Sequence, residues 1–512
     1  MKKLLLTVGA LAAAIGMRAY GAGIEKEVVV TPGTAERQTD GSWLCHIAPG
    51  TGWAWIEMRG FEPCADATGI TYDFYAPDFS VLTGIMTFLA DPDGGSTRWK
   101  SGQTPEEEGT WSHRVMMRDD PTALAFKPDN SFYCENHVNW AKADRFRLML
   151  IRQSGRGGDV RVANLRFLRK ATCRPPKAGE RRVAWCRTRG LSDRGDWEET
   201  GRFLERNKFT DLMALLSLGG CAHYDSKVLE RSTLLEPGRD SLKEALSACH
   251  RHGARLHVWR VNWDAEFPGD SEAWLAKTRA EGRFQVDSTG APRKWLCPSD
   301  PRNHALEVEA MKELAAKGVD GIHFDYMRFE DRDVCFCPRC LARLAGKTGR
   351  ASLTAAEVKA DKGLFTMWRK LRMEDITSVV REVSDYVRAH HPSVEISAAV
   401  QRTPDLGVEA LGQDWPGWAR AGYLDFVCPM NYYTSVDIYR HVVEQQMKYV
   451  KGTKTKLFPA IGVTCSNYPK MPPETFIREV DCVRAHGLEG FSVFVLVPYA
   501  EELLPRMNGV IW

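Results

Sequence analysis

Apolar and polar residues alternate in short runs through the first third of the chain, from about residue 24 to residue 170. Gly, Pro and Asp separate the runs, which include GITYDFYAP, TGIMTFLAD, RFRLMLIRQ and DVRVANLRFL. A period of two indicates strands with one buried face, and regular turn residues between them indicate an antiparallel all-β fold. We therefore predict a jelly-roll-like β-sandwich over 24–170. Its Trp99, Trp111 and Trp140 either stack on sugar rings, as in a carbohydrate-binding module, or belong to the core.

The pattern changes after a polar, Pro-containing stretch, ATCRPPKAGE at 171–180, which we interpret as a linker. From residue 181 to 512, strand-like apolar runs alternate with helical patterns, several of which end at a Gly. Eight such repeats predict a (β/α)8 TIM barrel and therefore a multidomain chain. An open doubly wound sheet is disfavoured because no Gly-rich phosphate loop follows the first strand. The expected strands are 182–186, 211–218, 255–263, 321–329, 395–400, 424–432, 456–463 and 490–498.

The first 22 residues have the order of a secretory signal peptide, with Lys2 and Lys3, a short apolar run, and small residues around a cleavage site near Ala22. A buried N-terminal helix is the less favoured alternative. We predict export to the periplasm or the extracellular space, with no membrane span in the mature chain. Cleavage removes three basic residues and no acid, so the formal charge falls from +3 to zero. Such a chain has no broad basic field for nucleic acid, and the sequence leaves the oligomeric state open.

One strand, GIHFDYMRF at 321–329, is apolar on one side and ends in charge. Alternation along a barrel strand predicts that Ile322, Phe324 and Tyr326 face the helices, whereas His323 and Asp325 face the interior. Active sites of these barrels lie at the carboxyl ends of the strands. A carboxylate directed into a barrel is costly unless it is paired or used. We therefore expect Asp325 to be functional and interpret the histidine as a core residue.

The same strand carries a resemblance to a known family. DGIHFDYMRF at 320–329 resembles the strand-four signature of glycosyl-hydrolase-like family 10, which is close to D-G-I-H-x-D-Y-x-R-Y-P. RRVAWCRTRG, HGARLHVWRVNW and GQDWPGWARAGYLDFVCPMNYY resemble the segments of this family around strands one, three and six. The likeness covers most of residues 181–500 and none of the predicted sandwich. Phe329 replaces the usual Tyr, no Pro follows it, and an acidic stretch with a cysteine cluster is inserted.

The resemblance implies glycoside hydrolysis, which requires two carboxyl groups on either side of the scissile bond and no cofactor for catalysis. Asp325 is the expected nucleophile or base, and a neighbouring Arg328 is expected to hold it ionised at neutral pH. Asp414, on the loop after strand five, is the expected partner, although the same residue fits a helix N-cap equally well. Asp264 and Glu266, after strand three, are further carboxyl groups at the barrel mouth.

Polar and aromatic residues at the ends of the predicted strands are candidates for binding a carbohydrate substrate. Amide and phenol groups there would hydrogen-bond sugar hydroxyls, and an indole would stack on a sugar ring. The expected substrate-binding residues are Tyr326, Arg328, Asn262, Trp263, Asn431, Tyr432, Tyr433 and Trp415.

The segment VCFCPRC places Cys335, Cys337 and Cys340 directly after the strand that carries Asp325. Their C-x-C-x-x-C spacing resembles part of a zinc site, but four ligands are normally required and the sequence does not reveal the fourth. A structural zinc ion and a local disulfide in an oxidising compartment are both compatible with these residues. Because all the ligands are thiols, the cluster has a structural role in either case.

Three functions remain open at this point. The first is an exported glycoside hydrolase that acts on a polysaccharide or glycan. The second is a non-catalytic carbohydrate-binding barrel. The third is a metal-dependent carbohydrate deacetylase with His257, His323 and Asp325 as metal ligands. A serine hydrolase is disfavoured because the chain has no G-x-S-x-G motif.

Overall fold

The chain folds into two compact units, one that ends at Ala171 and one that runs from Thr172 to Trp512. The computed structural model describes residues 24–50, 52–77, 82–99, 109, 111–120, 122–127, 129, 133–152, 156–169, 171–187, 196–265, 269–433, 435–464, 470–496 and 498–512. The predicted signal peptide lies outside the described residues. No described helix is long and apolar enough to cross a membrane.

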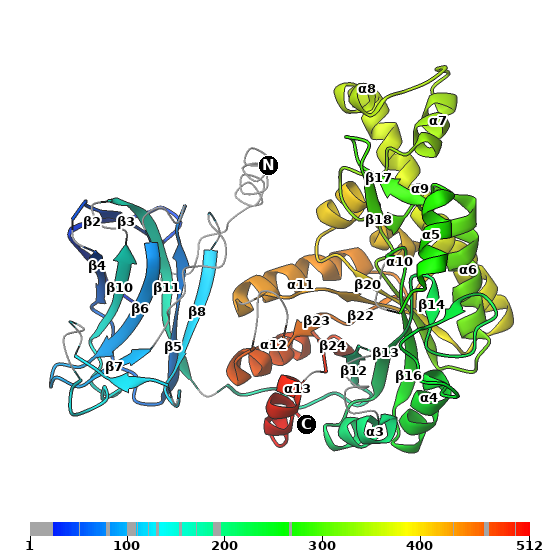
Figure 1. The fold of residues 1–512 in the computed structure, drawn as a ribbon. Coiled ribbons are helices and arrows are strands. Elements are labelled where there is room, and N and C mark those ends of the chain that lie inside the picture. The colour runs from blue at the N-terminus through cyan, green and yellow to red at the C-terminus, as the bar shows by residue number, and fades with distance from the viewer. Residues whose placement is uncertain are drawn as a thin grey trace. The chain divides into compact units, whose positions relative to one another are not determined.

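The first unit consists of two antiparallel sheets (Figure 1). The first sheet has the order β1-β4-β10-β6-β7-β9, and the second has the order β2-β3-β11-β5-β8. The strands are β1 (Glu27–Thr31), β2 (Gly33–Arg37), β3 (Trp43–Ile47), β4 (Trp53–Arg59), β5 (Ala67–Tyr75), β6 (Leu82–Ala90), β7 (Ser96–Trp99), β8 (Trp111–Met117), β9 (Leu124–Ala125), β10 (Arg145–Arg152) and β11 (Gly158–Arg169).

Apolar residues from both of these sheets form one buried cluster, to which Ile56 and Leu148 belong on one side and Ile70 and Val162 on the other. The alternation in the sequence therefore follows the pleat, since every second side chain enters this core. Trp99 and Trp140 are also buried in the cluster. The structure therefore places Trp99 and Trp140 in the core, which is one of the two roles that the sequence left open.

The second unit is built on a curled parallel sheet with the order β22-β21-β20-β19-β16-β13-β12-β24-β23. Each of the eight predicted strand segments contributes to it. Its strands are β12 (Arg181–Cys186), β13 (Asp211–Leu218), β16 (Arg255–Val261), β19 (Gly321–Asp325), β20 (Glu395–Val400), β21 (Phe426–Pro429), β22 (Lys456–Leu457), β23 (Ala460–Gly462) and β24 (Gly490–Phe494). The short strands β14 (Cys221–Ala222), β15 (Glu230–Arg231), β17 (Phe284–Val286) and β18 (Pro292–Leu296) lie in its connections.

The two ends of this strand order belong to one segment of chain. β22 pairs with β21, and β23, which begins only three residues after β22 ends, pairs with β24. The residues between them continue both ladders, because the Phe458 N–H donates to the Val427 carbonyl and the Ser492 N–H donates to the Pro459 carbonyl, at 2.9 and 3.2 Å. The sheet therefore curls until its first and last strands meet at this segment.

Helices follow most of the strands and cover the outside of the sheet (Figure 1). Asp, Ser or Thr caps most of their N-termini, which satisfies amide groups that have no partner within the helix. The helices are α3 (Trp197–Arg206), α4 (Ser241–Arg251), α5 (Glu272–Ala280), α6 (Pro301–Ala315), α7 (Pro338–Lys347), α8 (Ala355–Ala360), α9 (Lys362–His390), α10 (Trp415–Ala421), α11 (Val436–Val450), α12 (Pro473–Ala485) and α13 (Pro498–Leu503).

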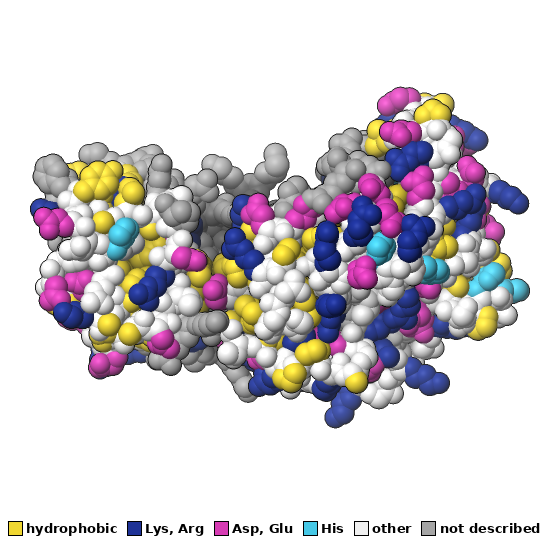
Figure 2. Space-filling model, turned by 90° about the horizontal axis from the view of Figure 1, so that it is seen from below, with side chains coloured by type: hydrophobic (Ala, Val, Ile, Leu, Met, Phe, Trp, Pro, Cys, Tyr) yellow, Lys and Arg dark blue, Asp and Glu magenta, His cyan; other side chains and the backbone are white. Residues whose placement is uncertain are grey.

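Charged side chains of both signs are interspersed over the described surface that Figure 2 presents. This distribution accords with the nearly balanced numbers of basic and acidic residues, 69 and 66.

The amino ends of the parallel strands are held by a buried ionic network. Asp211 accepts hydrogen bonds from Arg181, at 3.0 and 2.5 Å, and lies 3.1 Å from His257 Nε2. Burial alone would raise the pKa of Asp211, but the hydrogen bond and charge of the histidine and of Arg181 outweigh it and lower the pKa well below its usual range. The His257 ring also rests on Gly321, where any Cβ would collide with the imidazole. His257 is therefore a core residue, as the sequence predicts.

We expect Asp211→Asn to lower the free energy of unfolding by about 3 kcal/mol at neutral pH, because Arg181 loses a buried anionic partner. Since the folded-state pKa of Asp211 is depressed, the wild-type advantage is complete above the ordinary carboxyl pKa of about 4 and is lost as the pH falls below it. Melting temperatures at pH 7 and pH 3 test this. Asp225→Asn, at a side chain 76% exposed, should change stability by less than about 0.5 kcal/mol. An equal loss for Asp211→Asn at both pH values would contradict the assignment.

Candidate functional site

Asp325 is the last residue of β19 and is buried, with 4% of its surface exposed. Its Oδ2 accepts a hydrogen bond from Trp259 Nε1 at 3.0 Å, and its Oδ1 accepts one from the Tyr326 backbone N–H at 2.7 Å. Below the carboxylate, the rings of Trp185, Trp259 and Phe494 pack edge to face, with centroids 5.2 to 6.4 Å apart. Two hydrogen bonds and an apolar floor therefore fix the carboxylate at the carboxyl end of the strand.

Burial raises the pKa of Asp325 to about 6, and the Tyr326 N–H, the Arg328 charge and the Trp259 N–H offset only part of this effect. Asp325 is therefore still mostly ionised at neutral pH, as expected, but the Arg328 charge is not the main influence on its pKa. The guanidinium does favour the ionised form, but desolvation is the larger effect. A carboxyl group in this range exchanges its proton near neutral pH, which suits general acid–base work.

Tyr326 does not face the helices, contrary to the strand alternation. Its φ is 54°, so the backbone leaves the strand conformation directly after Asp325. The phenol ring stacks on the Trp295 indole of β18, with centroids 4.9 Å apart and planes 15° apart. The Arg328 guanidinium lies 4.6 and 4.8 Å from these two ring centroids and donates hydrogen bonds to the carbonyls of Phe329 and Glu330. Trp295, Tyr326 and Arg328 therefore form an aromatic and cationic wall next to Asp325.

Asp264 follows the neighbouring strand, β16, and pairs with Trp295 in a short antiparallel bridge. Burial, and then the charge of Glu330, raise the pKa of Asp264 to about 7, and Arg328 opposes the shift. The charges of both Asp264 and Asp325 act on the Tyr326 hydroxyl and on the Arg328 guanidinium. Two carboxyl groups with raised pKa values thus share the same tyrosine and arginine.

Asn262 and Trp263 are positioned differently from the prediction. Both are fully buried. The Asn262 side chain donates to Glu307 at 2.6 Å, and Glu307 also holds Arg260 through two hydrogen bonds of 2.8 and 2.9 Å. Trp263 has a φ of 65° and turns into the interior. These two residues support the turn after β16, and the prediction that they meet substrate is wrong for this geometry.

Asn431 and Trp415 are also structural. The Asn431 amide exchanges two hydrogen bonds, of 2.9 and 2.7 Å, with the Gln446 amide and is fully buried. Trp415 is fully buried and packs edge to face on Tyr449 at 5.6 Å. Neither side chain is available to a sugar, so these two predictions are corrected as well.

Tyr432 and Tyr433 remain partly exposed after β21. The Tyr432 ring stacks on Phe494 with centroids 5.1 Å apart, which places it next to the aromatic floor below Asp325. Arg402 lies over the Tyr433 ring at 5.2 Å.

Asp414 is the N-cap of α10, where its Oδ1 accepts a hydrogen bond from the Gly417 N–H at 2.9 Å. A Cβ at Gly417 would approach the other carboxylate oxygen to 2.1 Å, so the cap requires glycine there. Of the two roles left open by the sequence, the cap is the one seen in the contacts. Glu266, the remaining alternative, lies outside the described residues.

Three further residues of this site were not predicted from the sequence. Arg187, one residue beyond β12, lies over Phe494 at 5.4 Å, and its charge favours the ionised form of Asp325. Trp295 and Glu330 reach the site from β18 and from the loop after β19. The strand-end rule would have found Arg187, whereas no local pattern links Trp295 to Tyr326.

His257, His323 and Asp325 do not form a metal site. His323 is buried, its Nδ1 lies 2.8 Å from the Ser397 hydroxyl, and burial lowers its pKa. Within the described residues, the groups of His, Cys, Asp and Glu close enough to share an ion contain neither His323 nor Asp325. The ligand set expected for a deacetylase is therefore corrected.

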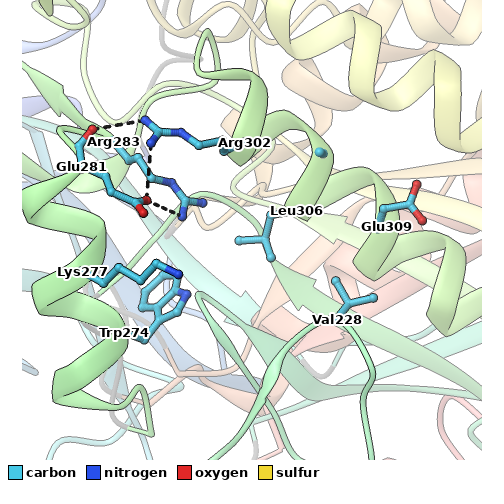
Figure 3. A pocket seen from close by; sticks show the side chains of 9 residues that line it. Val228, Trp274, Lys277, Glu281, Arg283, Arg302, Leu306 and Glu309 are labelled. Carbon is cyan, nitrogen blue, oxygen red and sulfur yellow. Dashed lines mark hydrogen bonds and ion pairs between the residues drawn. The ribbon is translucent and has the colours of Figure 1, made fainter.

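A surface pocket of about 400 Å³ lies between α5 and α6 (Figure 3). Three of its charged residues pair with one another, since Glu281 lies 3.4 Å from Arg283 and 3.5 Å from Arg302. None of the strand-end carboxyl groups lines it. We therefore place the candidate active site at Asp325 and Asp264.

A curled parallel sheet with carboxyl groups at the carboxyl ends of its strands is the arrangement of barrel proteins whose functional sites lie at that end. The family model described as glycosyl hydrolase-like 10 matches residues 190–472. The chain therefore belongs to glycosyl hydrolase-like family 10, as the resemblance in the sequence indicated.

One solved structure supports the fold. The chain is similar to the glycoside hydrolase domain of PgaB (BpsB) from Bordetella bronchiseptica, with 15% identity, a TM-score of 0.52, and coverage of 65% of this chain and 98% of that chain. The β-amylase catalytic domain from Paenibacillus polymyxa matches at 11% identity and a TM-score of 0.43, covering 62% and 92%. A β-galactosidase from Marinomonas ef1 matches at 11% identity and a TM-score of 0.45, and the match covers 62% of this chain and 54% of that chain. No curated protein shows significant similarity to the chain.

We expect Asp264→Asn to stabilise the protein at pH 8 and to leave stability unchanged near pH 4. Because the folded-state pKa of Asp264 is raised to about 7, the wild type loses stability as the pH rises from the ordinary carboxyl pKa of about 4 to this value, since the unfolded chain ionises over this range while the folded carboxyl group keeps its proton. The amide removes this cost, which we expect to be about 1–3 kcal/mol. Melting temperatures from pH 4 to pH 8 measure the effect.

The matched control for this comparison is Asp385→Asn, at an exposed position of α9. It should leave the pH dependence of the melting temperature unchanged. Parallel curves for Asp264→Asn and the wild type would show that the Asp264 carboxyl group is not perturbed.

Proposed function

We propose that the protein is an exported glycoside hydrolase that cleaves a polysaccharide or glycan with Asp325 and Asp264. The observation that carries the proposal is the pair of carboxyl groups at the ends of adjacent parallel strands, both with raised pKa values and both acting on Tyr326 and Arg328. Family membership supports the reaction class. Asp264 replaces Asp414 as the partner of Asp325, because the contacts of Asp414 are those of a helix cap.

The two pKa values suggest a division of roles. With a pKa of about 7, Asp264 retains its proton in a large share of molecules at neutral pH and serves as the general acid. It protonates the glycosidic oxygen as the bond to the anomeric carbon breaks, and the bonding electron pair leaves with that oxygen. Asp325, with a pKa of about 6, is mostly ionised at neutral pH. It acts on the anomeric carbon, either directly as nucleophile or by taking a proton from the attacking water.

Aromatic residues around the pair supply contacts for sugar rings. The stacked Trp295 and Tyr326 form one wall, and Tyr432 on Phe494 forms another. The guanidinium of Arg328 and the exposed Arg187 provide hydrogen-bond donors for hydroxyl groups. In this proposal the curled sheet is a complete (β/α)8 barrel, supported by the segment that pairs with both β21 and β24.

The first unit is proposed to be a β-sandwich that binds carbohydrate. The support comes from β4, whose Ala54, Ile56 and Met58 enter the core whereas Trp53 and Trp55 alternate with them on the opposite face. Trp53 is 55% exposed, so its indole is accessible to a sugar.

A non-catalytic carbohydrate-binding barrel is the second candidate function. It is favoured by the burial of Asp325, since both of its carboxylate oxygens already accept hydrogen bonds from the protein. In that case the carboxylate would orient the turn at Tyr326 instead of acting on substrate.

Turnover on a panel of bacterial, plant and host glycans separates the two functions. We expect the wild type to release reducing ends, and Asp325→Asn and Asp264→Asn each to lower kcat by about 10²-fold or more, since each removes one acid–base or nucleophilic group. Asp414→Asn should retain activity, because asparagine caps a helix as well as aspartate. Binding without release by the wild type, and equally by Asp325→Asn, would favour the binding protein. Loss of activity in Asp414→Asn but not in Asp264→Asn would restore Asp414 as the partner.

The pH dependence of kcat/KM tests the assignment of acid and base. We expect a bell-shaped profile with its maximum between about pH 6 and pH 7, where Asp325 is ionised while Asp264 is still protonated. Asp264→Asn should abolish the alkaline limb in its residual activity. A wild-type rate that stays constant from pH 6 to pH 9 would exclude Asp264 as the general acid.

A further inference from the structure

Four cysteines meet in the second unit, one more than the sequence motif contains. Cys297, directly after β18, joins Cys335, Cys337 and Cys340 from the loop after β19 and the start of α7. All four are buried, and their Sγ atoms all lie within 4.8 Å of one another. Cys297 Sγ lies 3.8 Å from Cys337 Sγ and 3.6 Å from Cys340 Sγ.

This spacing fits a tetrahedral metal ion. With Zn–S bonds of about 2.3 Å, a tetrahedron of thiolates separates its sulfur atoms by about 3.8 Å. Four thiols that all lie within reach of one another satisfy this geometry as a set. Two disulfides would require only two close pairs and give no reason for all four sulfurs to converge.

Backbone amides are directed at one of the sulfur atoms. The N–H groups of Val286 and Cys337 both donate to Cys335 Sγ at 3.4 Å. Donors on a sulfur atom stabilise its thiolate form, which is the form that binds metal. Val286 belongs to β17, so the donor comes from the same hairpin that carries Cys297.

A buried cation next to the cluster provides independent support. Arg372 of α9 is 3% exposed and lies over the Trp368 ring at 4.4 Å, and the indole N–H of Trp368 donates to the Cys335 carbonyl at 3.0 Å. Its hydrogen bonds go to the carbonyls of Ala410 and Asp331, and within the described residues it has no ion pair with a carboxylate. A buried guanidinium without an anion is costly. Zinc with four thiolates carries a net charge of −2, so it would be the missing counter-ion.

We propose that Cys297, Cys335, Cys337 and Cys340 bind one structural Zn²⁺ ion, with Arg372 as the buried counter-charge of the zinc-thiolate centre. The ion joins the β17–β18 hairpin to the loop after β19. These insertions lie together with α7 and α8 at one end of the second unit (Figure 1).

The zinc site also positions the wall of the candidate active site. Cys297 is two residues after Trp295, which contacts both Tyr326 and Arg328, and Arg293 on the same strand pairs with Glu330 at 2.9 Å. Metal binding therefore fixes the strand that bridges to Asp264. The metal makes no contact with substrate in this proposal, and its presence does not depend on the proposed reaction.

Metal analysis of the purified full chain tests the proposal. We expect one zinc per chain by elemental analysis, and native mass spectrometry should show the mass of one zinc ion that acid denaturation releases. The cysteines should then titrate as free thiols. Iron in place of zinc, or a metal-free chain whose denatured mass is lower by four hydrogen atoms because two disulfides have formed, would overturn the assignment.

Variants locate the site. Cys297→Ser should lower the zinc content at least tenfold and lower the melting temperature, whereas Cys482→Ser, a buried cysteine of α12 outside the cluster, should keep one zinc. If Cys297→Ser fails to fold, stripping the wild type with a chelator and restoring it with zinc alone gives the same information. The melting temperature should fall on removal and recover on addition. A full zinc content in Cys297→Ser would exclude Cys297 as the fourth ligand.

Discussion

The parallel register between β16 and β19 determines the candidate active site. This register places Val261 opposite Asp325, so the residues after the two strands leave the sheet at the same edge. The buried pair of Arg260 and Glu307 supports the turn on the β16 side, where Glu307 also holds Asn262. Because both turns continue through a residue with positive φ, Trp263 and Tyr326, the chain changes direction at once and brings Asp264 and Asp325 to a shared tyrosine and arginine.

The pKa values of buried carboxylates are shifted in opposite directions at the two ends of the sheet. At the amino end, Asp211 receives hydrogen bonds from Arg181 and lies against His257, so its pKa falls despite full burial. At the carboxyl end, the hydrogen bonds that Asp325 accepts from described residues come from neutral N–H groups, and burial raises its pKa to about 6. The first arrangement stabilises the fold through charge pairing. The second keeps a carboxyl group poised to exchange a proton, at a cost in stability that active sites commonly carry.

The inserted segments around the cysteine cluster link helix α9 to the wall of the candidate active site. Phe336 stacks on Trp368 at 4.6 Å, and the Trp368 indole donates to the Cys335 carbonyl at 3.0 Å, so α9 anchors the loop after β19. The β17–β18 hairpin meets the same loop through the Phe336 N–H and the Val286 carbonyl, 2.8 Å apart. Phe336 also belongs to a small apolar cluster with residues of α7, α8 and α9, so this cluster and the proposed metal ion together hold a wall of the site in place.

The sequence by itself determined the alternation of strands in the first unit, the eight strand segments of the second, the family, and the position of Asp325 at the carboxyl end of its strand. These follow from periodicity and from one local motif, both of which are properties of neighbouring residues. Tertiary structure decided which strand-end residues meet. Asn262 and Asn431 turned inward to buried hydrogen-bond partners, Trp263 and Trp415 are buried in the interior, and Asp414 capped its helix. Asp264, Trp295 and Cys297 joined the site and the cluster because strand register and a hairpin brought distant segments together. That information lies in long-range packing, which no local pattern contains.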